Sequence, residues 1–293
     1  MDKLTRLEQQ SIFIIREAYA TVKNLGMLWS IGKDSTVVLW LTRKAFFGHV
    51  PLPLIHIDTS FKIPEMIQYR DELAREWELQ LLRGQNSEAI ARKETFPDGT
   101  IDRIRCCRTL KTMPLAGMVD GSLPRFQLNL ETGNYEPYEN REPFGGLILG
   151  IRADEEGTRS KERHFSPRTG DNNWKVAEQP PELWGYFNTE FPPGAHVRVH
   201  PLLDWTELDV WEYIKREAIS TVGLYYDQGA GTRYRSLGCA ACTSTICSSA
   251  KNVDEIIAEL REGALAKIPE RSGRAQDKDD AGGLETLRKD GYM

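Results

Sequence analysis

A polar hexapeptide at residues 30–35, Ser-Ile-Gly-Lys-Asp-Ser, lies between two apolar stretches and has the composition of a phosphate-binding loop. Gly32 lets the backbone approach phosphate oxygens, and a helix that begins after it would offer free N–H groups and the positive end of its dipole. Lys33 adds charge, and the other polar side chains add two hydroxyl donors and a carboxylate suited to orienting the loop or holding Mg²⁺: Ser30, Ser35 and Asp34. The hexapeptide therefore predicts a loop that grips pyrophosphate. The alternative is an ordinary capped helix after a tight turn.

The five cysteines are grouped rather than spread along the chain. Cys106 and Cys107 are adjacent, Cys239 and Cys242 form a Cys-x-x-Cys pair, and Cys247 follows shortly after. Such grouping favours a metal or cluster site over a disulfide framework. Basic residues flank the tandem pair and would offset the charge of thiolates: Arg103, Arg105, Arg108 and Lys111.

The elements that must position these residues alternate between short apolar runs and helical patterns, which predicts βαβ units and a parallel sheet. Strands are expected at 27–29, 53–58, 79–82, 145–151 and 198–202, and helices at 2–24, from 36, at 64–78 and from 206. A stretch rich in Gly, Pro, Asn and charge, 121–143, is expected to be a loop or insertion. The expected domains are residues 1–220, including that insertion, and a C-terminal region of 221–293 with a mobile charged tail from 270.

Composition limits the possible partners and location. The formal charge is −5 over 293 residues, so a global basic field for nucleic acid is absent and any such contact needs a local patch or a partner protein. The chain contains no apolar run near the ~20 residues that span a bilayer, and its N-terminus does not have the pattern of a signal peptide. The expected location is cytoplasmic, without membrane contact, where cysteines usually stay reduced.

Four sequence blocks carry a resemblance to a known family: MLWSIGKDSTVVLWL, HIDTSFKIPEMIQYRDELA, GIRADEEGTRSKER and RVHPLLDWTELDVWEYI. They resemble the adenylylating subunit of bacterial sulfate adenylyltransferase and the wider phosphoadenosine-phosphosulfate reductase superfamily of PP-loop ATP pyrophosphatases. The tail from Arg271 is also similar to that subunit's C-terminus. The resemblance implies an α/β, parallel-sheet fold of the adenine nucleotide α-hydrolase-like (PP-loop) type with a helical C-terminal region. It also implies a Mg²⁺-dependent reaction that splits ATP into AMP and pyrophosphate and activates an oxyanion.

The same resemblance implies a nucleotide site built from the hexapeptide and from residues that follow two later strands. Asp58 closes the second expected strand, at the carboxyl edge where nucleotides bind in open α/β sheets. The implied nucleotide- and Mg²⁺-binding residues are Ser30, Gly32, Lys33, Asp34, Ser35, Asp58, Gly150, Asp154 and Glu155. The implied catalytic residues are Lys33, Asp34, Arg152 and Arg159, of which the arginines would bind phosphate or another oxyanion. Without the family, 152–163 would be interpreted as a solvated charged helix.

The cysteines depart from the sulfate adenylyltransferase pattern and resemble the iron–sulfur motif of adenosine-phosphosulfate reductases. Four thiolates are the usual ligands of a 4Fe–4S cluster, so Cys106, Cys107, Cys239 and Cys242 are the expected metal ligands. Zinc is the rival, although adjacent cysteines suit it less well because their side chains diverge, and free thiols are a third possibility. Cys247 lies outside the pattern and is interpreted as a small buried hydrophobe, with a sulfur-relay role as the weaker alternative.

Several functions compete on these features. A sulfonucleotide reductase needs a C-terminal nucleophilic cysteine, and no cysteine follows Cys247. The cluster cysteines favour adenylation of a DNA backbone phosphate for sulfur incorporation, as in phosphorothioation proteins of the DndC and SspD type, with a cysteine desulfurase as sulfur donor and DNA bound through a partner complex. The alternative is sulfate activation to adenosine phosphosulfate beside a GTPase subunit. A tRNA-thiolation enzyme and a nucleotide-sensing scaffold are more distant readings.

Overall fold

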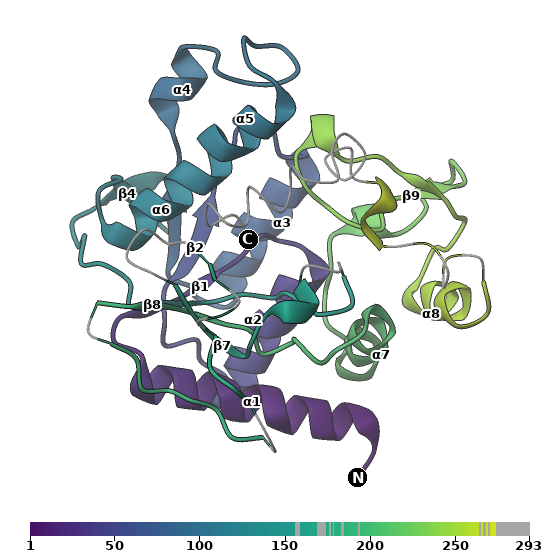
Figure 1. Ribbon diagram of the computed structural model, residues 1–293. Helices are drawn as coiled ribbons and strands as arrows, with labels where there is room; N and C mark the ends of the chain where they lie inside the picture. The colour runs from purple at the N-terminus through teal and green to yellow at the C-terminus, as the bar shows by residue number, and fades with distance from the viewer. Residues whose placement is uncertain are drawn as a thin grey trace.

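The computed structural model describes residues 1–155, 159–168, 174–175, 177, 179–182, 185–192, 194–263, 265, 268 and 270–273. Its centre is an eight-stranded sheet with the order β5-β4-β3-β2-β1-β6-β8-β7 (Figure 1). The strands are β1 Leu25–Leu28, β2 Leu54–Ile57, β3 Leu81–Gly84, β4 Arg125–Leu128, β5 Tyr135–Tyr138, β6 Gly146–Ile148, β7 Phe165–Arg168 and β8 His196–Val199. A two-stranded ribbon pairs β9, Thr232–Arg233, with β10, Ile246–Cys247.

The five central strands, β3-β2-β1-β6-β8, run parallel, and the strands at both edges are antiparallel to them. The order of the sheet reverses at β1, because β2 and β3 extend the sheet to one side and β6 joins it on the other. In open α/β sheets, a crevice forms at such a reversal, outside the carboxyl ends of the strands. The expected α/β fold with a mostly parallel sheet is therefore confirmed, and its topology marks one place for a ligand.

Helices cover both faces of the sheet (Figure 1). Alternate residues of a strand point to opposite faces, and accordingly Met27 and Leu54 belong to a larger core cluster while Leu28 and Ile55 belong to a smaller one. The larger cluster includes residues of α1 Lys3–Thr21, α2 Lys33–Ala45, α3 Pro64–Glu76, α7 Glu207–Glu217 and α8 Val253–Glu262. The smaller cluster packs the other face against α6, Met113–Asp120. Burial on both faces explains the continuous apolar runs of the central strands.

The segment 121–143, expected to be a loop or insertion, contains a β-hairpin. Its strand β4 pairs antiparallel with β3, and β5 pairs with β4 at the edge of the sheet. The side chain of Asn129 accepts hydrogen bonds from the backbone N–H groups of Glu131 and Thr132, both at 3.0 Å, which folds the turn. The turn residues of the hairpin therefore account for the composition that suggested a loop.

The C-terminal part of the chain differs from the expectation of a mobile tail from residue 270. Residues 270–273 form a short 3-10 helix, η7, in which Glu270 and Arg271 are buried. The rest of that predicted tail, 274–293, lies outside the described residues. Among the helices that the structure describes, none has the length and apolar character needed to cross a membrane.

Candidate active site at the switch point of the sheet

The phosphate loop connects β1 to α2 at the reversal of the sheet. Ile31 is buried and has a φ of +71°, in the left-handed region, which is rare for a β-branched residue and costs on the order of 1–3 kcal/mol. Gly32 then caps α2 in an extended conformation, and the hydroxyl of Tyr225 accepts a hydrogen bond from the backbone N–H of Lys33 at 2.9 Å. The packing around the loop thus holds a strained backbone in place and points the N-terminus of α2 at the crevice.

Gly150 allows the end of β6 to lie directly against this helix. A Cβ atom at Gly150 would lie 2.7 Å from the backbone N and 2.8 Å from the Cα of Ser35, closer than side chains approach backbone atoms in proteins. Neither of these two backbone atoms can move without displacing the first turn of α2. The block that follows β6 is therefore brought to the phosphate loop by a close approach that only glycine permits.

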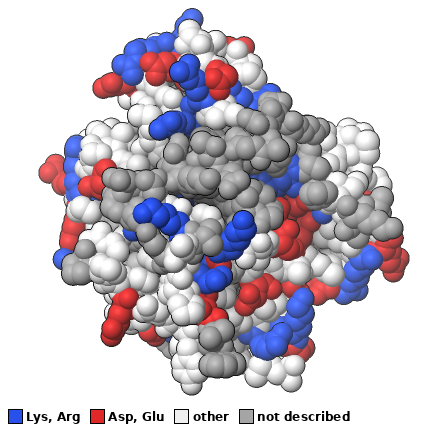
Figure 2. All heavy atoms as spheres, in the orientation of Figure 1, with Lys and Arg blue, Asp and Glu red and all other residues white. Residues whose placement is uncertain are grey.

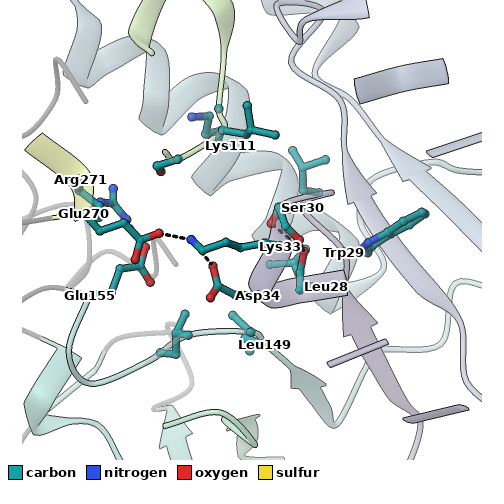
Figure 3. Close-up of a pocket in the computed structure, with 18 of the residues that line it drawn as sticks. Leu28, Trp29, Ser30, Lys33, Asp34, Lys111, Leu149, Glu155, Glu270 and Arg271 are labelled. Atoms are coloured by element: carbon teal, nitrogen blue, oxygen red, sulfur yellow. Dashed lines mark hydrogen bonds and ion pairs between the residues drawn. The ribbon is translucent and has the colours of Figure 1, made fainter. Parts of the chain in front are cut away.

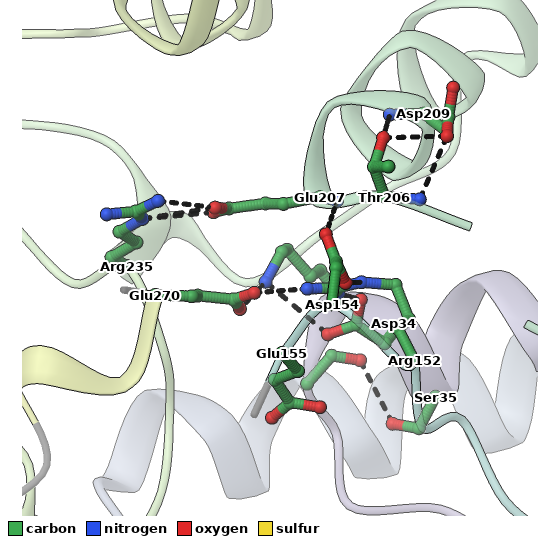
Figure 4. A network of polar contacts seen from close by, with 12 residues as sticks. Asp34, Ser35, Arg152, Asp154, Glu155, Thr206, Glu207, Asp209, Arg235 and Glu270 are labelled. Atoms are coloured by element: carbon green, nitrogen blue, oxygen red, sulfur yellow. Dashed lines mark hydrogen bonds and ion pairs between the residues drawn. The ribbon is translucent and has the colours of Figure 1, made fainter. Parts of the chain in front are cut away.

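The two chain segments meet in a buried ionic network (Figure 4). Arg152 is fully buried and forms ion pairs with three carboxylates, those of Asp34, Asp154 and Glu270. Lys33 is 1% exposed, and its ammonium contacts the same Glu270 and lies 3.4 Å from a carboxylate oxygen of Asp34. Glu270 thus holds a position between the two cations on which the predicted phosphate site depends.

A second set of charges surrounds this network. Glu155 pairs with Arg159 and lies 3.3 Å from Arg271. On the other side, Asp154 accepts a hydrogen bond at 2.9 Å from the backbone N–H of Glu207 at the start of α7, and the Glu207 carboxylate pairs with Arg235 at 2.7 Å. The site therefore links the strand ends to α7 and to the C-terminal segment, which also accepts a hydrogen bond from Arg235 at the carbonyl of Ile268, at 2.8 Å.

The electrostatics keep three of these groups ionised despite their burial. Burial disfavours the ammonium of Lys33, but the carboxylates of Asp34 and Glu270 raise its pKa above the ordinary value. Burial likewise opposes ionisation of Glu270, but the positive charges of Arg152 and Lys33 lower its pKa overall. For Glu155, the charges of Arg159 and Arg271 outweigh burial and lower its pKa. Lys33, Glu270 and Glu155 are consequently held in their charged forms, whereas at Asp34 burial outweighs the charges of Arg152 and Lys33 and raises the pKa of the carboxyl.

A pocket opens beside the network, and Figure 3 shows its lining. The hexapeptide supplies one wall through Ser30, Gly32, Lys33, Asp34 and Ser35, and the segment after β6 supplies Gly150, Glu155 and Arg159. Lys62 and Lys111 add positive charge to the lining, and Glu270 and Arg271 close the pocket from the C-terminal segment. On the described part of the surface in Figure 2, basic and acidic side chains are interspersed.

The cysteines come from two segments that lie near the same pocket. Cys106 and Cys107 end helix α5, Arg103–Cys107, and Cys239 precedes a 3-10 turn, η5, Ala240–Cys242. The second segment docks on the loop after β2, where Lys62 and Cys239 form a β-bridge and the thiol of Cys239 lies 3.2 Å from the hydroxyl of Thr59. Burial raises the pKa of the Cys106 thiol to about 11, and the neighbouring thiols add to this shift. For Cys239, burial is outweighed by the charges of Lys111 and Lys62, and its pKa is lowered.

The structure brings most of the predicted site residues together. Arg152 and Asp154 do not line the pocket but belong to the ionic network beside it. Asp58 is in neither the lining nor the network; its carboxylate accepts a hydrogen bond from the backbone N–H of Ser60 at 2.8 Å and lies 3.9 Å from Arg83. Cys247 was expected to be buried but is exposed, because it lies on the short β9–β10 ribbon. Sequence reasoning missed the partners that reach the site from afar: Tyr225, Glu207, Arg235 and Glu270. Only Arg271, the first residue of the tail that resembles the family, pointed toward this segment.

Comparison with known proteins agrees with the geometry. Residues 24–245 match the family model described as the phosphoadenosine phosphosulfate reductase domain. Among solved structures, the phosphoadenylyl-sulfate reductase of Candida auris in a phosphate complex aligns with a TM-score of 0.51, covering 84% of this chain and 98% of that one. At 17% sequence identity, this likeness concerns the fold alone.

Curated relatives resemble the chain over nearly its whole length. A protein of Rhizobium tropici named sulfate adenylyltransferase subunit 2 is 36% identical, over 99% of this chain and 93% of its own. A protein of Geotalea daltonii with the same name is 37% identical, over 99% of this chain and 98% of its own. The chain therefore belongs to the phosphoadenosine phosphosulfate reductase domain family, together with the proteins named sulfate adenylyltransferase subunit 2.

Proposed function

We propose that this protein is the adenylylating subunit of a sulfate adenylyltransferase, which transfers AMP from ATP to sulfate and releases pyrophosphate. That it is an ATP-using adenylyltransferase follows from its family and its full-length relatives. The structural observation that supports release of pyrophosphate is the pair of buried cations, Lys33 and Arg152, which converge on one anion position beside the N-terminus of α2. The choice of sulfate as the acceptor rests on the name of the full-length relatives. Such an arrangement suits a leaving group that is itself a multiply charged anion.

In the proposed reaction, a sulfate oxygen attacks the α-phosphorus of ATP, and the bond from that phosphorus to the β-bridging oxygen breaks. Lys33 and Arg152 neutralise the charge that develops on the departing pyrophosphate, and the N–H groups of the loop and of α2 bind its oxygens. Lys62 and Lys111 supply positive charge in the same pocket, where sulfate must bind for the attack. Arg159 lines that pocket too and is proposed to bind a phosphate or the sulfate.

Mg²⁺ is the metal that this chemistry requires, and oxygen ligands are what it prefers. The pocket offers the carboxylates of Asp34 and Glu155, so these two residues would hold the ion together with the phosphates of the nucleotide. When bound, Mg²⁺ would add to the neutralisation of phosphate charge. We also propose Asp154 as a positioning residue, because it orients Arg152 at 2.9 Å rather than lining the pocket.

The hypothesis of DNA phosphorothioation is wrong. Relatives that span 99% of the chain carry the name sulfate adenylyltransferase subunit 2, which supports the sulfate-activating alternative. The hypothesis treated four grouped cysteines as a sign of sulfur handling, but grouped thiols do not determine which oxyanion the adenylylating pocket accepts. The partners that this hypothesis implied, a cysteine desulfurase and DNA, are therefore not supported. A GTPase subunit is the partner that the sulfate-activating reaction predicts, with the complex in the cytoplasm.

The 4Fe–4S cluster stays a prediction. The thiols of Cys106, Cys107, Cys239 and Cys242 lie close enough to influence one another's ionisation. However, in the part of the chain that the structure describes, no group of three or more His, Cys, Asp or Glu side chains is arranged to hold a metal ion. The thiols as placed do not form a metal site, and no reaction step is assigned to a cluster. Iron and zinc analysis of protein purified without oxygen tests the prediction, with Cys247→Ser as the control outside the set.

The test of the proposed function is the acceptor dependence of pyrophosphate release. The protein, in complex with the GTPase subunit of a sulfate adenylyltransferase, is incubated with ATP, Mg²⁺ and GTP, with either sulfate or chloride at equal ionic strength. We expect pyrophosphate and adenosine phosphosulfate to accumulate in equal amounts, and only with sulfate. Release of ADP and phosphate, or pyrophosphate release at the same rate with and without sulfate, would show that the reaction has been misassigned.

A further inference from the structure

The position between Lys33 and Arg152 is already taken by a carboxylate of the protein itself. Glu270 is 7% exposed and pairs with both cations at once (Figures 3 and 4). It comes from η7, more than two hundred residues along the chain from the phosphate loop, so its place there is set by the fold and not by local sequence. A carboxylate between two buried cations has the charge and the oxygen donors of a small anion, and those are the properties by which this position would recognise a phosphate.

With Glu270 in place, the charges of the ionic network are balanced, and Lys62 and Lys111 of the pocket lining are not part of that network. Four cations are paired with four carboxylates, and these are Lys33, Arg152, Arg159 and Arg271 with Asp34, Asp154, Glu155 and Glu270. A polyphosphate that approaches the position of Glu270 gains little net Coulombic attraction from a balanced network, and at this position it would also meet a buried negative charge. Removal of the Glu270 carboxylate leaves one positive charge in excess, located where the phosphate must bind.

We propose that Glu270 is a resident anion that occupies the pyrophosphate position in the free protein, and that a polyphosphate binds by displacing its carboxylate. The inference rests on the proposed function, because it takes this position as the polyphosphate site. Displacement exchanges one anion for another at Lys33 and Arg152, so neither buried cation is left unpaired at any stage, a state that is costly in a protein interior. The free site is thereby kept closed and charge-compensated until its ligand arrives.

The attachment of the C-terminal segment fits such an exchange. Besides Glu270, the polar contacts between the described part of the segment and the site include Arg271, which lies 3.3 Å from Glu155, and the hydrogen bond from Arg235 to the carbonyl of Ile268. Both contacts are polar and lie at or near the pocket. Because Glu270 and Arg271 are adjacent, displacement of the first also loosens the second. We therefore expect η7 to leave its position when a polyphosphate enters.

The test uses inorganic pyrophosphate as the probe, with its affinity measured by titration calorimetry in wild type and Glu270→Gln. Glutamine keeps the size of the side chain and removes its charge, so we expect pyrophosphate to bind at least ~10-fold more tightly. Glu270→Asp keeps the charge and is expected to bind within a few-fold of wild type. The matched control is Glu162→Gln, because Glu162 is another buried carboxylate paired with an arginine, Arg168, at 3.0 Å, outside the pocket lining. It should leave the affinity unchanged.

A measurement on the wild-type protein tests the inference even if the Glu270→Gln variant does not fold. Hydrogen exchange at the backbone amides of 270–273 should become faster when pyrophosphate binds to wild type. If pyrophosphate binds to wild type but Glu270→Gln binds it equally or more weakly, or if exchange at 270–273 slows, Glu270 stays in the loaded site and the inference fails while the proposed function stands. If neither protein binds pyrophosphate, the polyphosphate site itself has been misassigned.

Discussion

Two networks of buried charges in this molecule look alike by burial and pairing but differ in their surroundings. The site network joins Lys33, Arg152 and Glu270 at the switch point of the sheet. The edge network joins Glu162 and Arg168 at 3.0 Å beside the antiparallel strand β7, and both side chains are as inaccessible as those of the site. The hydroxyl of Ser166 bridges this second pair, 2.8 Å from Glu162 and 3.0 Å from Arg168.

The comparison teaches that buried ion pairs do not by themselves identify a site. What distinguishes the first network is the backbone around it: a left-handed isoleucine, a glycine pressed against a helix, and a helix N-terminus that faces a pocket. Two of these features constrain the backbone, because Ile31 is held in a left-handed conformation and Gly150 has no room for a side chain. The edge network, in contrast, ties β7 to the residues that flank it, and its expected role is structural.

The largest effect should come from removing a cation from each network. Lys33→Ala is expected to lower pyrophosphate release at least ~10²-fold, the scale for the loss of one preorganised group that stabilises charge in the transition state. Arg168→Ala should instead lower the free energy of unfolding by about 3–5 kcal/mol, because it leaves the Glu162 carboxylate buried without its partner. Turnover and urea denaturation are measured on both variants.

Lys33→Ala should affect mainly turnover, and Arg168→Ala should affect mainly the free energy of unfolding. Lys44→Ala is the control on the same helix, because Lys44 pairs with Glu8 and Glu217 outside the pocket lining. It should retain turnover within a few-fold of wild type. If the Arg168→Ala variant is folded but loses turnover as severely as Lys33→Ala, the two networks do not differ in the proposed way, as functional and structural.

A smaller effect should follow from adding one methyl group at the close approach of β6 and α2. Gly150→Ala places a Cβ within 2.9 Å of the backbone of Asp34 and Ser35, so the strand end or the helix must shift. We expect the free energy of unfolding to fall by about 1–3 kcal/mol, the usual range for overpacking, together with a loss of turnover. Gly223→Ala is the matched control, since a Cβ there meets no atom within 4 Å. Equal stability of the two variants would mean that the close contact is not needed.

How far the site could be predicted depends on whether its parts are local in sequence. The hexapeptide and the block after β6 carry their chemistry in consecutive residues, and the alternation of strands and helices was enough to place both at the carboxyl edge of one sheet. The expected strands at 27–29 and 53–58 correspond to β1 and β2, offset by one or two residues. Where a strand is buried on both faces of the sheet, the length and apolar composition of its segment suffice to identify it.

The remaining parts depend on contacts between distant segments. Glu270 lies in a charged stretch whose composition indicates a tail, and Glu207 lies in an ordinary amphipathic helix; only the folded chain brings them to Lys33 and Arg152. Asp58 follows a strand as a nucleotide-binding aspartate would, but it turns toward the backbone of Ser60. The hairpin at 121–143 was missed because its turn residues dominate the composition of a segment with only four residues in each strand.

The smallest expected effect concerns the pH dependence of the edge region, where His164 lies 3.3 Å from Asp204. Burial alone would lower the pKa of His164, but the hydrogen bond and charge of Asp204, with a further contribution from Glu182, raise it above its ordinary value of 6.5. The stability that this pair contributes is therefore fully present below pH 6.5 and is lost as the pH rises through the raised pKa. Because Asp204 is 55% exposed, solvent screens the pair and the loss should be small. Urea denaturation from pH 6 to 9 should show wild type losing more stability than Asp204→Asn, and equal slopes for the two proteins would show that the pair contributes nothing to the pH dependence of stability. Pyrophosphate itself titrates in this range, so its affinity should change with pH in the same way in both proteins, because Lys33 and Arg152 stay charged in both.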